Sequence, residues 1–352
     1  MRRIVLIGIA ACFYYSGIVA LARWITRRSK SRLIVLNYHR ATGGDLRRHL
    51  LYLRCHYSIM HVEKALEELY APFKKAVAQP DERTLLALTF DDGYRDNYTH
   101  AYALARELQI PFTIYLIPGY LDSGAHFWWL EAKRLVKCAR VDTVTLDGQT
   151  FHLNSAEDRS TLACLIDAGA RYSRSVEERE QFLAAMRTAL AVPSERGGED
   201  DPSLPLTWDE VREMDASGLV SFGAHTMHHP ILAYLVDQRE MQSEVADCRT
   251  VLEKQLGHPV RTFAYPVGQA QHVNRAAIEV VQKAGFIWAF TTKYGINTPG
   301  SDPYLLRRVE VDVDQHWLVI AAEAAGLWGF FSRLRWLPFI RKNFTNAANA
   351  GR

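Results

Sequence analysis

The 352-residue chain is poor in several features that define whole classes of protein. Its five cysteines are odd in number, scattered and never arranged as Cys-x-x-Cys, so neither a disulfide framework nor a thiolate zinc cluster is indicated. The formal net charge of +3 is small for this length, which argues against a nucleic-acid partner. No internal repeat or long low-complexity tract is present. The composition is that of an ordinary globular protein, long enough for one large domain or two small ones.

One long apolar run, Ile4–Ala22, stands between Arg2 and Arg3 and a further group of basic residues. Its length is at the threshold for a membrane-spanning helix. We therefore interpret residues 1–30 as a single-pass anchor in the cell membrane with a basic flank, which implies contact with membrane lipid. A cleaved signal peptide and a lipidated Cys12 are the alternatives. The basic residues after the run outnumber those before it, which favours a cytoplasmic domain.

After this segment, short apolar strands alternate with amphipathic helices. Such alternation is typical of an α/β protein with a parallel sheet. Repeated units on one core suggest a (β/α) barrel, in which functional groups gather at the carboxyl ends of the strands. The predicted strands cover residues 33–40, 85–90, 112–117, 219–224, 260–265 and 286–291.

Residues 123–205 break the alternation and are predicted to be an insertion. They contain an aromatic triplet, Phe127-Trp128-Trp129, a hairpin signal at Asp147-Gly148 and two helical runs. The insertion could cap a site or be a remote structural elaboration. Aromatic rings can stack on sugars, but we favour a core role for this triplet.

Two segments carry the chemistry. Asp91 and Asp92 end an apolar strand, and adjacent strand residues point to opposite faces, so one carboxylate can bind a metal while the other handles a proton. Downstream, His225 and His229 are four residues apart and can share one face. Two imidazoles and a carboxylate form an open metal site that activates water. His228 is the local alternative to His229.

These segments, Thr89-Phe-Asp-Asp-Gly-Tyr94 and His225-Thr-x-x-His-Pro230, resemble the first two motifs of the polysaccharide deacetylases (NodB homology, carbohydrate esterase family 4). The resemblance covers roughly Leu33 to Trp317, apart from the insertion. It implies a distorted, incomplete (β/α) barrel of the NodB type over residues 31–325. It also implies a metal-dependent hydrolase that removes N-acetyl groups from amino sugars of a polysaccharide or a lipid-linked glycan.

The resemblance also implies residue roles. Asp91 corresponds to the general base, while Asp92, His225 and His229 correspond to the metal ligands. The metal would be a divalent ion, most suitably zinc, although cobalt, nickel or iron fit the same ligands.

The third motif departs from the pattern. Many family members have Arg-Pro-Pro-Tyr-Gly, where the Arg pairs with the base, whereas residues 263–268 read Phe-Ala-Tyr-Pro-Val-Gly, with Ala264 in place of the Arg. This form resembles the branch that contains the poly-N-acetylglucosamine deacetylases. The oxyanion donor would then be the backbone N–H of Val267. The missing charge beside Asp91 is assigned to Arg307, with Arg308 as the alternative.

The general acid of the family is a histidine near the C-terminal end, where His316 is the nearest candidate. However, residues 35–40, Val-Leu-Asn-Tyr-His-Arg, resemble the N-terminal element of the same branch, in which the barrel is circularly permuted. We therefore assign the general acid to His39, with His316 as the fallback. The alternative for His39 is a buried histidine at a strand end.

Other functions stay open at this stage. The chain could be a catalytically impaired glycan-binding relative, an O-acetyl esterase or another amidohydrolase on the same fold. A peptidase is disfavoured because the 225–229 segment lacks the glutamate of His-Glu-x-x-His. The basic aromatic tail, residues 326–352, could lie at a membrane interface or pack on the barrel. Family members that act on exported glycans would need the non-cytoplasmic face, so the membrane face stays open.

Overall fold

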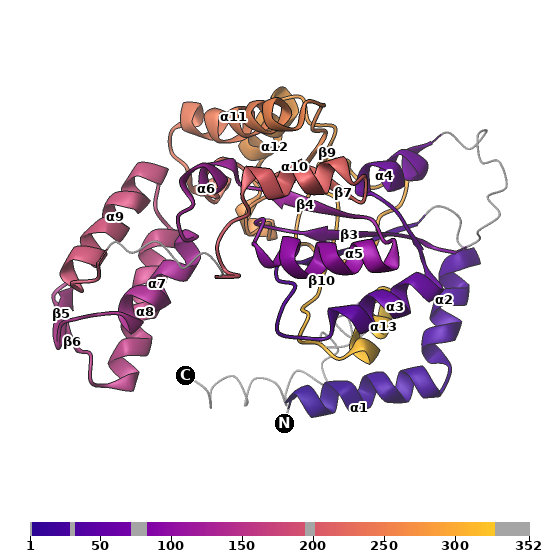
Figure 1. The fold of residues 1–352 in the computed structure, drawn as a ribbon, viewed down its shortest axis with the longest axis horizontal. Helices are drawn as coiled ribbons and strands as arrows, with labels where there is room; N and C mark the ends of the chain where they lie inside the picture. Colours follow the sequence, from indigo (N-terminus) through magenta and orange to yellow (C-terminus); the bar gives the residue numbers. More distant parts are fainter. Residues whose placement is uncertain (1, 29–31, 72–82, 194–200, 328–352) are drawn as a thin grey trace.

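The computed structural model describes residues 2–28, 32–71, 83–193 and 201–327 (Figure 1). Apart from its first two residues, the predicted C-terminal tail lies outside this part of the chain.

A curled sheet of parallel strands forms the centre of the molecule, in the order β10-β1-β3-β4-β7-β8-β9. Leu306 makes a parallel bridge with Phe290 of β9, and β10, which begins three residues later, pairs with β1. The segment from Leu306 to β10 therefore contacts both β9 and β1, which curls the sheet. This curled half-barrel confirms the predicted α/β class. The first strand in sequence, β1, lies beside the last one, β10. The strands are β1 (Leu33–Tyr38), β2 (Ser58–Ile59, paired with β3), β3 (Leu85–Phe90), β4 (Phe112–Leu116), β7 (Val220–Ala224), β8 (Thr262–Ala264), β9 (Trp288–Phe290) and β10 (Val309–Glu310).

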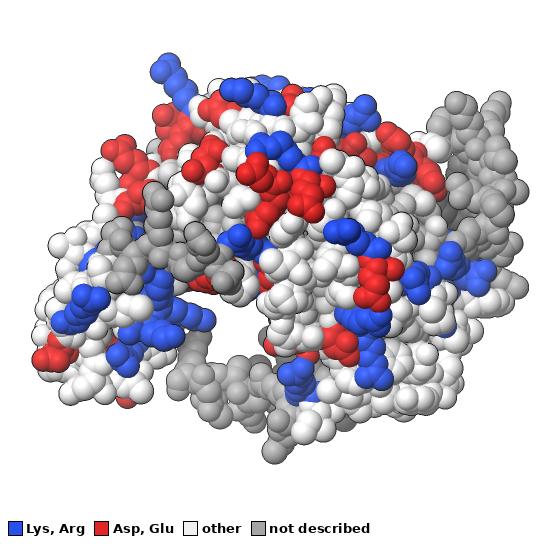
Figure 2. All heavy atoms as spheres, in the orientation of Figure 1, with Lys and Arg blue, Asp and Glu red and all other residues white. Residues whose placement is uncertain are grey.

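Amphipathic helices cover the sheet and bury one face each. In Figure 1, α5 and α10 lie over β3 and β4, and charges of both signs are interspersed on their outer side (Figure 2). A capping box begins α10: the Thr207 side chain accepts the Glu210 backbone N–H, and the Glu210 side chain accepts the Thr207 backbone N–H. The helices are α3 (Leu46–His56), α4 (Val62–Tyr70), α5 (Ala103–Leu108), α6 (Pro118–Ser123), α10 (Trp208–Ala216), α11 (Gln238–Leu256), α12 (Arg275–Lys283) and α13 (Trp317–Ala324).

The insertion projects from the carboxyl side of the sheet as a small unit with its own core (Figure 1). Its hairpin turns at Asp147-Gly148, both with positive φ, as the sequence predicted. Ser155 and Ser175 cap its last two helices. Its elements are α7 (Trp128–Lys137), β5 (Thr143–Leu146), β6 (Gln149–His152), α8 (Ala156–Arg171) and α9 (Val176–Ala189).

The N-terminal apolar run forms two helices, α1 (Arg2–Tyr15) and α2 (Ile18–Arg28), which meet at a bend of 65°. Gly17, with a φ of 82°, lies at the break. Within the described ranges no single helix is long and apolar enough to cross a membrane, although the bent pair has the length and composition to do so. The predicted single spanning helix is therefore not confirmed.

Candidate active site

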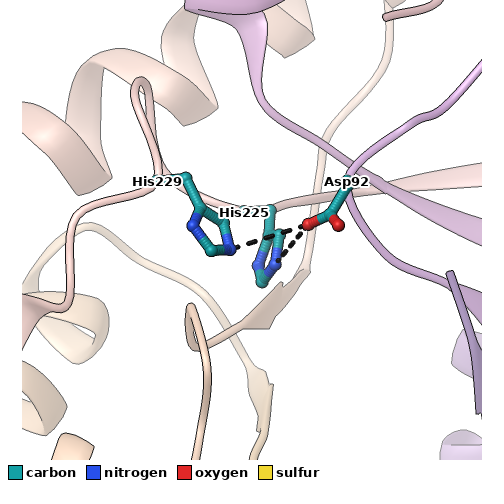
Figure 3. Close-up of side chains that lie close together, drawn as sticks. All are labelled: Asp92, His225 and His229. Atoms are coloured by element: carbon teal, nitrogen blue, oxygen red, sulfur yellow. Dashed lines mark ion pairs between the residues drawn. The ribbon is translucent and has the colours of Figure 1, made fainter. Parts of the chain in front are cut away.

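Three buried side chains converge where β3 and β7 end (Figure 3). Asp92 follows β3, and His225 and His229 lie on the loop after β7. The Nε2 atoms of His225 and His229 lie 3.5 and 3.6 Å from the same Asp92 oxygen. One ligand atom from each residue lies within 4.8 Å of the other two. The structure thus brings together the three predicted ligands in a set that suits a divalent transition metal.

Hydrogen bonds orient the two imidazoles. His225 Nδ1 donates to the Ala264 carbonyl at 2.7 Å, which leaves Nε2 directed at Asp92. The backbone N–H of His229 donates to Thr226 Oγ1, while its Nδ1 is buried without a hydrogen-bond partner among the described residues. The orientation of His225 is what a metal ligand requires, because its outer nitrogen is fixed by the backbone.

The two histidines have opposite pKa shifts. Burial lowers the pKa of His225, but the hydrogen bond to Asp92 and the nearby carboxylate charges outweigh it, so the pKa is raised. Burial, together with the adjacent His225, holds the pKa of His229 well below its ordinary value. His229 is therefore held in the neutral form that binds a metal.

The backbone around this cluster is strained. Asp92, Thr226, His229 and Val267 all have positive φ, between 57° and 73°. Such values are uncommon for residues other than glycine, and least favourable for β-branched Thr and Val. Strain of this kind persists where the surrounding packing fixes a functional geometry.

The second carboxylate, Asp91, lies in a buried ion pair with Arg308. The guanidinium donates to both Asp91 oxygens at 2.7 Å, and Asn37 Nδ2 donates to one of them at 3.0 Å. Burial raises the pKa of Asp91, but the charge of Arg308 outweighs it and brings the pKa to about 2. Asp91 is thus held as an oriented carboxylate.

The prediction of Arg307 is wrong, because Arg308 supplies the charge beside Asp91. Arg308 is 1% exposed and also donates to Asn37 Oδ1 and the Thr291 carbonyl. The exposed Arg307 side chain instead lines a separate cavity of about 510 Å³. Adjacent residues in an extended segment point to opposite sides, so only one of the pair can reach Asp91.

Asn37 is a residue of the site that was not predicted from the sequence. It is a fully buried polar residue in an otherwise apolar strand, and it bonds Asp91, Arg308 and Thr89. A buried amide needs partners, so its position near the end of an apolar strand was the signal that could have identified it.

His39 follows β1 and lines a cavity of about 320 Å³ together with Arg40, Glu310 and Gln315. The carbonyl of the preceding residue, Tyr38, accepts the Asp91 N–H at 2.9 Å, which places His39 beside the site. The fallback residue His316 instead caps α13, where its Nδ1 accepts the Leu318 N–H.

Val267 lies in the loop after β8, and its carbonyl accepts the Thr292 hydroxyl. Among the described residues, its N–H group has no hydrogen-bond acceptor. The group is therefore available to donate to a ligand.

His228, the alternative ligand, belongs to a different network. Its Nδ1 lies 2.6 Å from Oε1 of Glu244 on α11, and its backbone N–H donates to Oε2 of the same carboxylate. Gly119 packs against the same loop, since a Cβ there would lie 2.5 Å from the Met227 carbonyl. These contacts fix the loop and place His228 outside the three-residue cluster.

The insertion directly contacts the loop that carries His225 and His229. Phe127 and Trp128 are buried, as expected of core residues, and Trp128 Nε1 donates to the His229 carbonyl at 3.1 Å. The half-buried Trp129 lies with its ring centroid 4.4 Å from that of His229 and donates to the Tyr94 hydroxyl. The insertion is thus part of the wall of the site.

A parallel half-barrel with an Asp-His-His cluster and an oriented carboxylate at the strand ends defines a hydrolase-type site. Comparison with known proteins identifies the family. The polysaccharide deacetylase family model matches residues 78–288, more than half of the chain, and the chain therefore belongs to this family. It is an enzyme of the class that hydrolyses non-peptide carbon–nitrogen bonds.

Individual relatives are distant. YxkH of Bacillus subtilis (strain 168), provisionally named a polysaccharide deacetylase, is 22% identical over 296 residues, which are 82% of this chain and 74% of that protein. IcaB from Ammonifex degensii shares the fold with a TM-score of 0.53 and 21% identity, covering 84% of this chain and 97% of that one. A de-N-acetylase from Aggregatibacter actinomycetemcomitans gives a TM-score of 0.52 at 16% identity, with 83% and 99% covered.

Proposed function

We propose that this polysaccharide deacetylase is metal-dependent and removes N-acetyl groups from amino sugars of a polysaccharide or a lipid-linked glycan. The observation that carries the proposal is the position of the Arg308-paired Asp91 next to the Asp92, His225 and His229 cluster. Zinc suits two imidazoles and one carboxylate, although cobalt, nickel and iron fit the same donors.

Each residue has a role in amide hydrolysis. A divalent ion held by Asp92, His225 and His229 supplies Lewis-acid chemistry and lowers the pKa of water. Asp91 accepts the proton of the attacking water, and its bonds to Arg308 hold the carboxylate in place.

Two further groups complete the reaction. The Val267 N–H donates to the developing oxyanion, where side-chain identity matters little because the donor is backbone. His39, at the edge of the cavity that it lines, donates a proton to the departing amine. Amide cleavage then yields acetate and a free amino sugar.

Two alternatives differ in their outcome. An O-acetyl esterase would use the same groups, whereas a glycan-binding relative would not require the buried Asp91–Arg308 pair. The presence of an oriented base, a ligand set and an available N–H donor favours catalysis over binding alone.

The test is acetate release from N-acetylglucosamine oligomers by the full chain, with and without chelator. Asp91→Asn is the control, since it preserves side-chain volume and removes the base. Chelator-sensitive release that this variant loses supports the proposal. Absence of release by a metal-loaded wild type, with release from O-acetylated sugars, assigns the esterase instead.

Location at the cell membrane, in contact with lipid, is part of the same proposal. The apolar N-terminal helices support it, and a membrane location would suit a lipid-linked substrate. Fractionation of cells that produce the full chain tests this point, and recovery in the soluble fraction alone contradicts it.

A further inference from the structure

The N-terminal bracket, which we define as α1 and α2 (residues 2–28), carries most of the large exposed hydrophobic residues in the part of the chain that the structure describes. Nine of the fourteen large exposed hydrophobic residues in the described ranges belong to it. Figure 2 shows this edge as white spheres with blue patches. The nine residues are Ile4, Val5, Leu6, Ile9, Tyr15, Ile18, Leu21, Trp24 and Ile25. A concentration of apolar surface on one element marks an interaction site.

The opposite side of the bracket is packed on the catalytic domain. Ala10 is fully buried against Leu318 and Val319 of α13. The Tyr14 ring lies 5.0 Å from that of Trp317 at the start of α13. These contacts, on the side away from solvent, hold α1 along the domain rather than perpendicular to it (Figure 1).

The charge of the bracket is positive and therefore complementary to an anionic surface. Residues 1–32 contain seven lysines and arginines and no acidic residue. Basic residues flank the apolar run at both ends, which favours retention of both ends on one side of a membrane. At 1.5 Å per residue the two helices are about 21 and 16 Å long, each shorter than the roughly 30 Å hydrocarbon core.

We propose that the bracket lies in the interface of an anionic lipid bilayer, with its apolar side in the headgroup and acyl boundary. The N-terminus and the catalytic domain then occupy the same side of the membrane, and no segment of the bracket spans it. Amphipathic helices bind in this way through buried apolar area and attraction to anionic lipid. The inference refines the proposed membrane location but does not depend on the hydrolytic chemistry.

The attachment also brings the site close to the lipid. Arg3 donates to the carbonyl of Asp314, and the next residue, Gln315, lines the cavity that contains His39. The start of α1 therefore adjoins the loop that borders this cavity. A glycan attached to a lipid would need to extend only a short distance from the headgroup level.

The test is flotation of the purified full chain with vesicles of phosphatidylcholine, with or without 30% phosphatidylglycerol (about one lipid in three). The variant Val5→Glu/Ile9→Glu/Leu21→Glu places three charges at exposed bracket positions. The control Leu165→Glu/Val236→Glu/Ile287→Glu makes the same charge change at exposed apolar positions elsewhere. Both variants should fold, because none of the six side chains is buried.

We expect salt-sensitive binding that prefers anionic vesicles, at least tenfold weaker binding in the bracket variant, and no such loss in the control. Hydrolysis of a soluble acetylated sugar should be equal in all three proteins, which separates this test from that of the proposed function. Unchanged flotation of the bracket variant overturns the proposal. A second test uses native membranes and a chain with an N-terminal tag, to which protease is added on the side of the catalytic domain. Protection of the tag from this protease would show that the bracket spans the membrane, and it would also overturn the proposal. If the wild-type protein is a dimer without lipid and the bracket variant is a monomer, the apolar surface binds a second copy of the chain instead of lipid.

Discussion

Replacement of Arg308 by Met is the most informative perturbation of the site. Met retains an unbranched apolar stem, so the packing near the Tyr115 and Phe290 rings, 5.7 and 5.9 Å from the guanidinium, is largely kept. The change removes the positive charge and all four hydrogen bonds of the guanidinium to Asp91, Asn37 and Thr291.

The expected cost follows from the burial of the pair. Asp91 and Arg308 are 2% and 1% exposed, so loss of one partner leaves a carboxylate without compensation in the interior. Breaking such a pair typically costs about 3–5 kcal/mol of unfolding free energy. Since domains are stable by only about 5–15 kcal/mol, this is a large fraction of the total.

The assay is urea unfolding in the presence of chelator, so that no bound cation compensates Asp91. Arg307→Met is the matched control, and we expect a change within about 0.5 kcal/mol because that side chain is exposed. In a double-mutant cycle, Asp91→Asn should recover about 2 kcal/mol of the loss caused by Arg308→Met. Equal effects of the two arginine variants, or an additive cycle, would refute the reasoning.

Three further predictions concern single groups. His229→Ala should abolish binding of zinc measured by elemental analysis, whereas His228→Ala should retain it, and loss in both would show that the loop rather than the ligand matters. His39→Ala should lower the rate of acetate release about 10²-fold or more with metal still bound, and an unchanged rate would move the acid role to His316 or elsewhere. Burial raises the pKa of Glu323 to about 7 from 4.5, so the folded state favours the protonated form. Its contribution to stability is complete below pH 4.5 and is lost as the pH rises through 7, so the stability advantage of Glu323→Gln should grow by about 2.5 kcal/mol between pH 5 and pH 8. A flat difference across this range, followed by chemical denaturation, would contradict the assignment.

Much of the fold was predictable because its signals are local. Apolar strands, helix caps and the Asp147-Gly148 turn are properties of a few neighbouring residues, and the strands occur close to the predicted ranges. The grouping of Asp92, His225 and His229 was also predicted, from the resemblance of their two motifs to those of the family and because strand ends in a parallel sheet meet at one edge.

Choices between adjacent residues were less predictable. Arg307 and Arg308 have the same chemistry, and only the pairing of β10 with β1 decides which one faces Asp91. His228 and His229 differ in the same way, since Glu244 from a distant helix takes His228. The contact of Trp129 with His229 depends on how the insertion packs, which no local pattern encodes.

The sequence by itself determined the chemical groups, their order along the chain and their place at strand ends, because motif spacing and strand periodicity depend on neighbouring residues. The tertiary structure decided which arginine orients Asp91 and how the apolar N-terminal run is presented. At Gly17 the run bends and packs along α13 instead of continuing as one helix. These outcomes depend on register, side-chain direction and contacts between segments up to about three hundred residues apart, and such contacts are fixed only when the whole core packs.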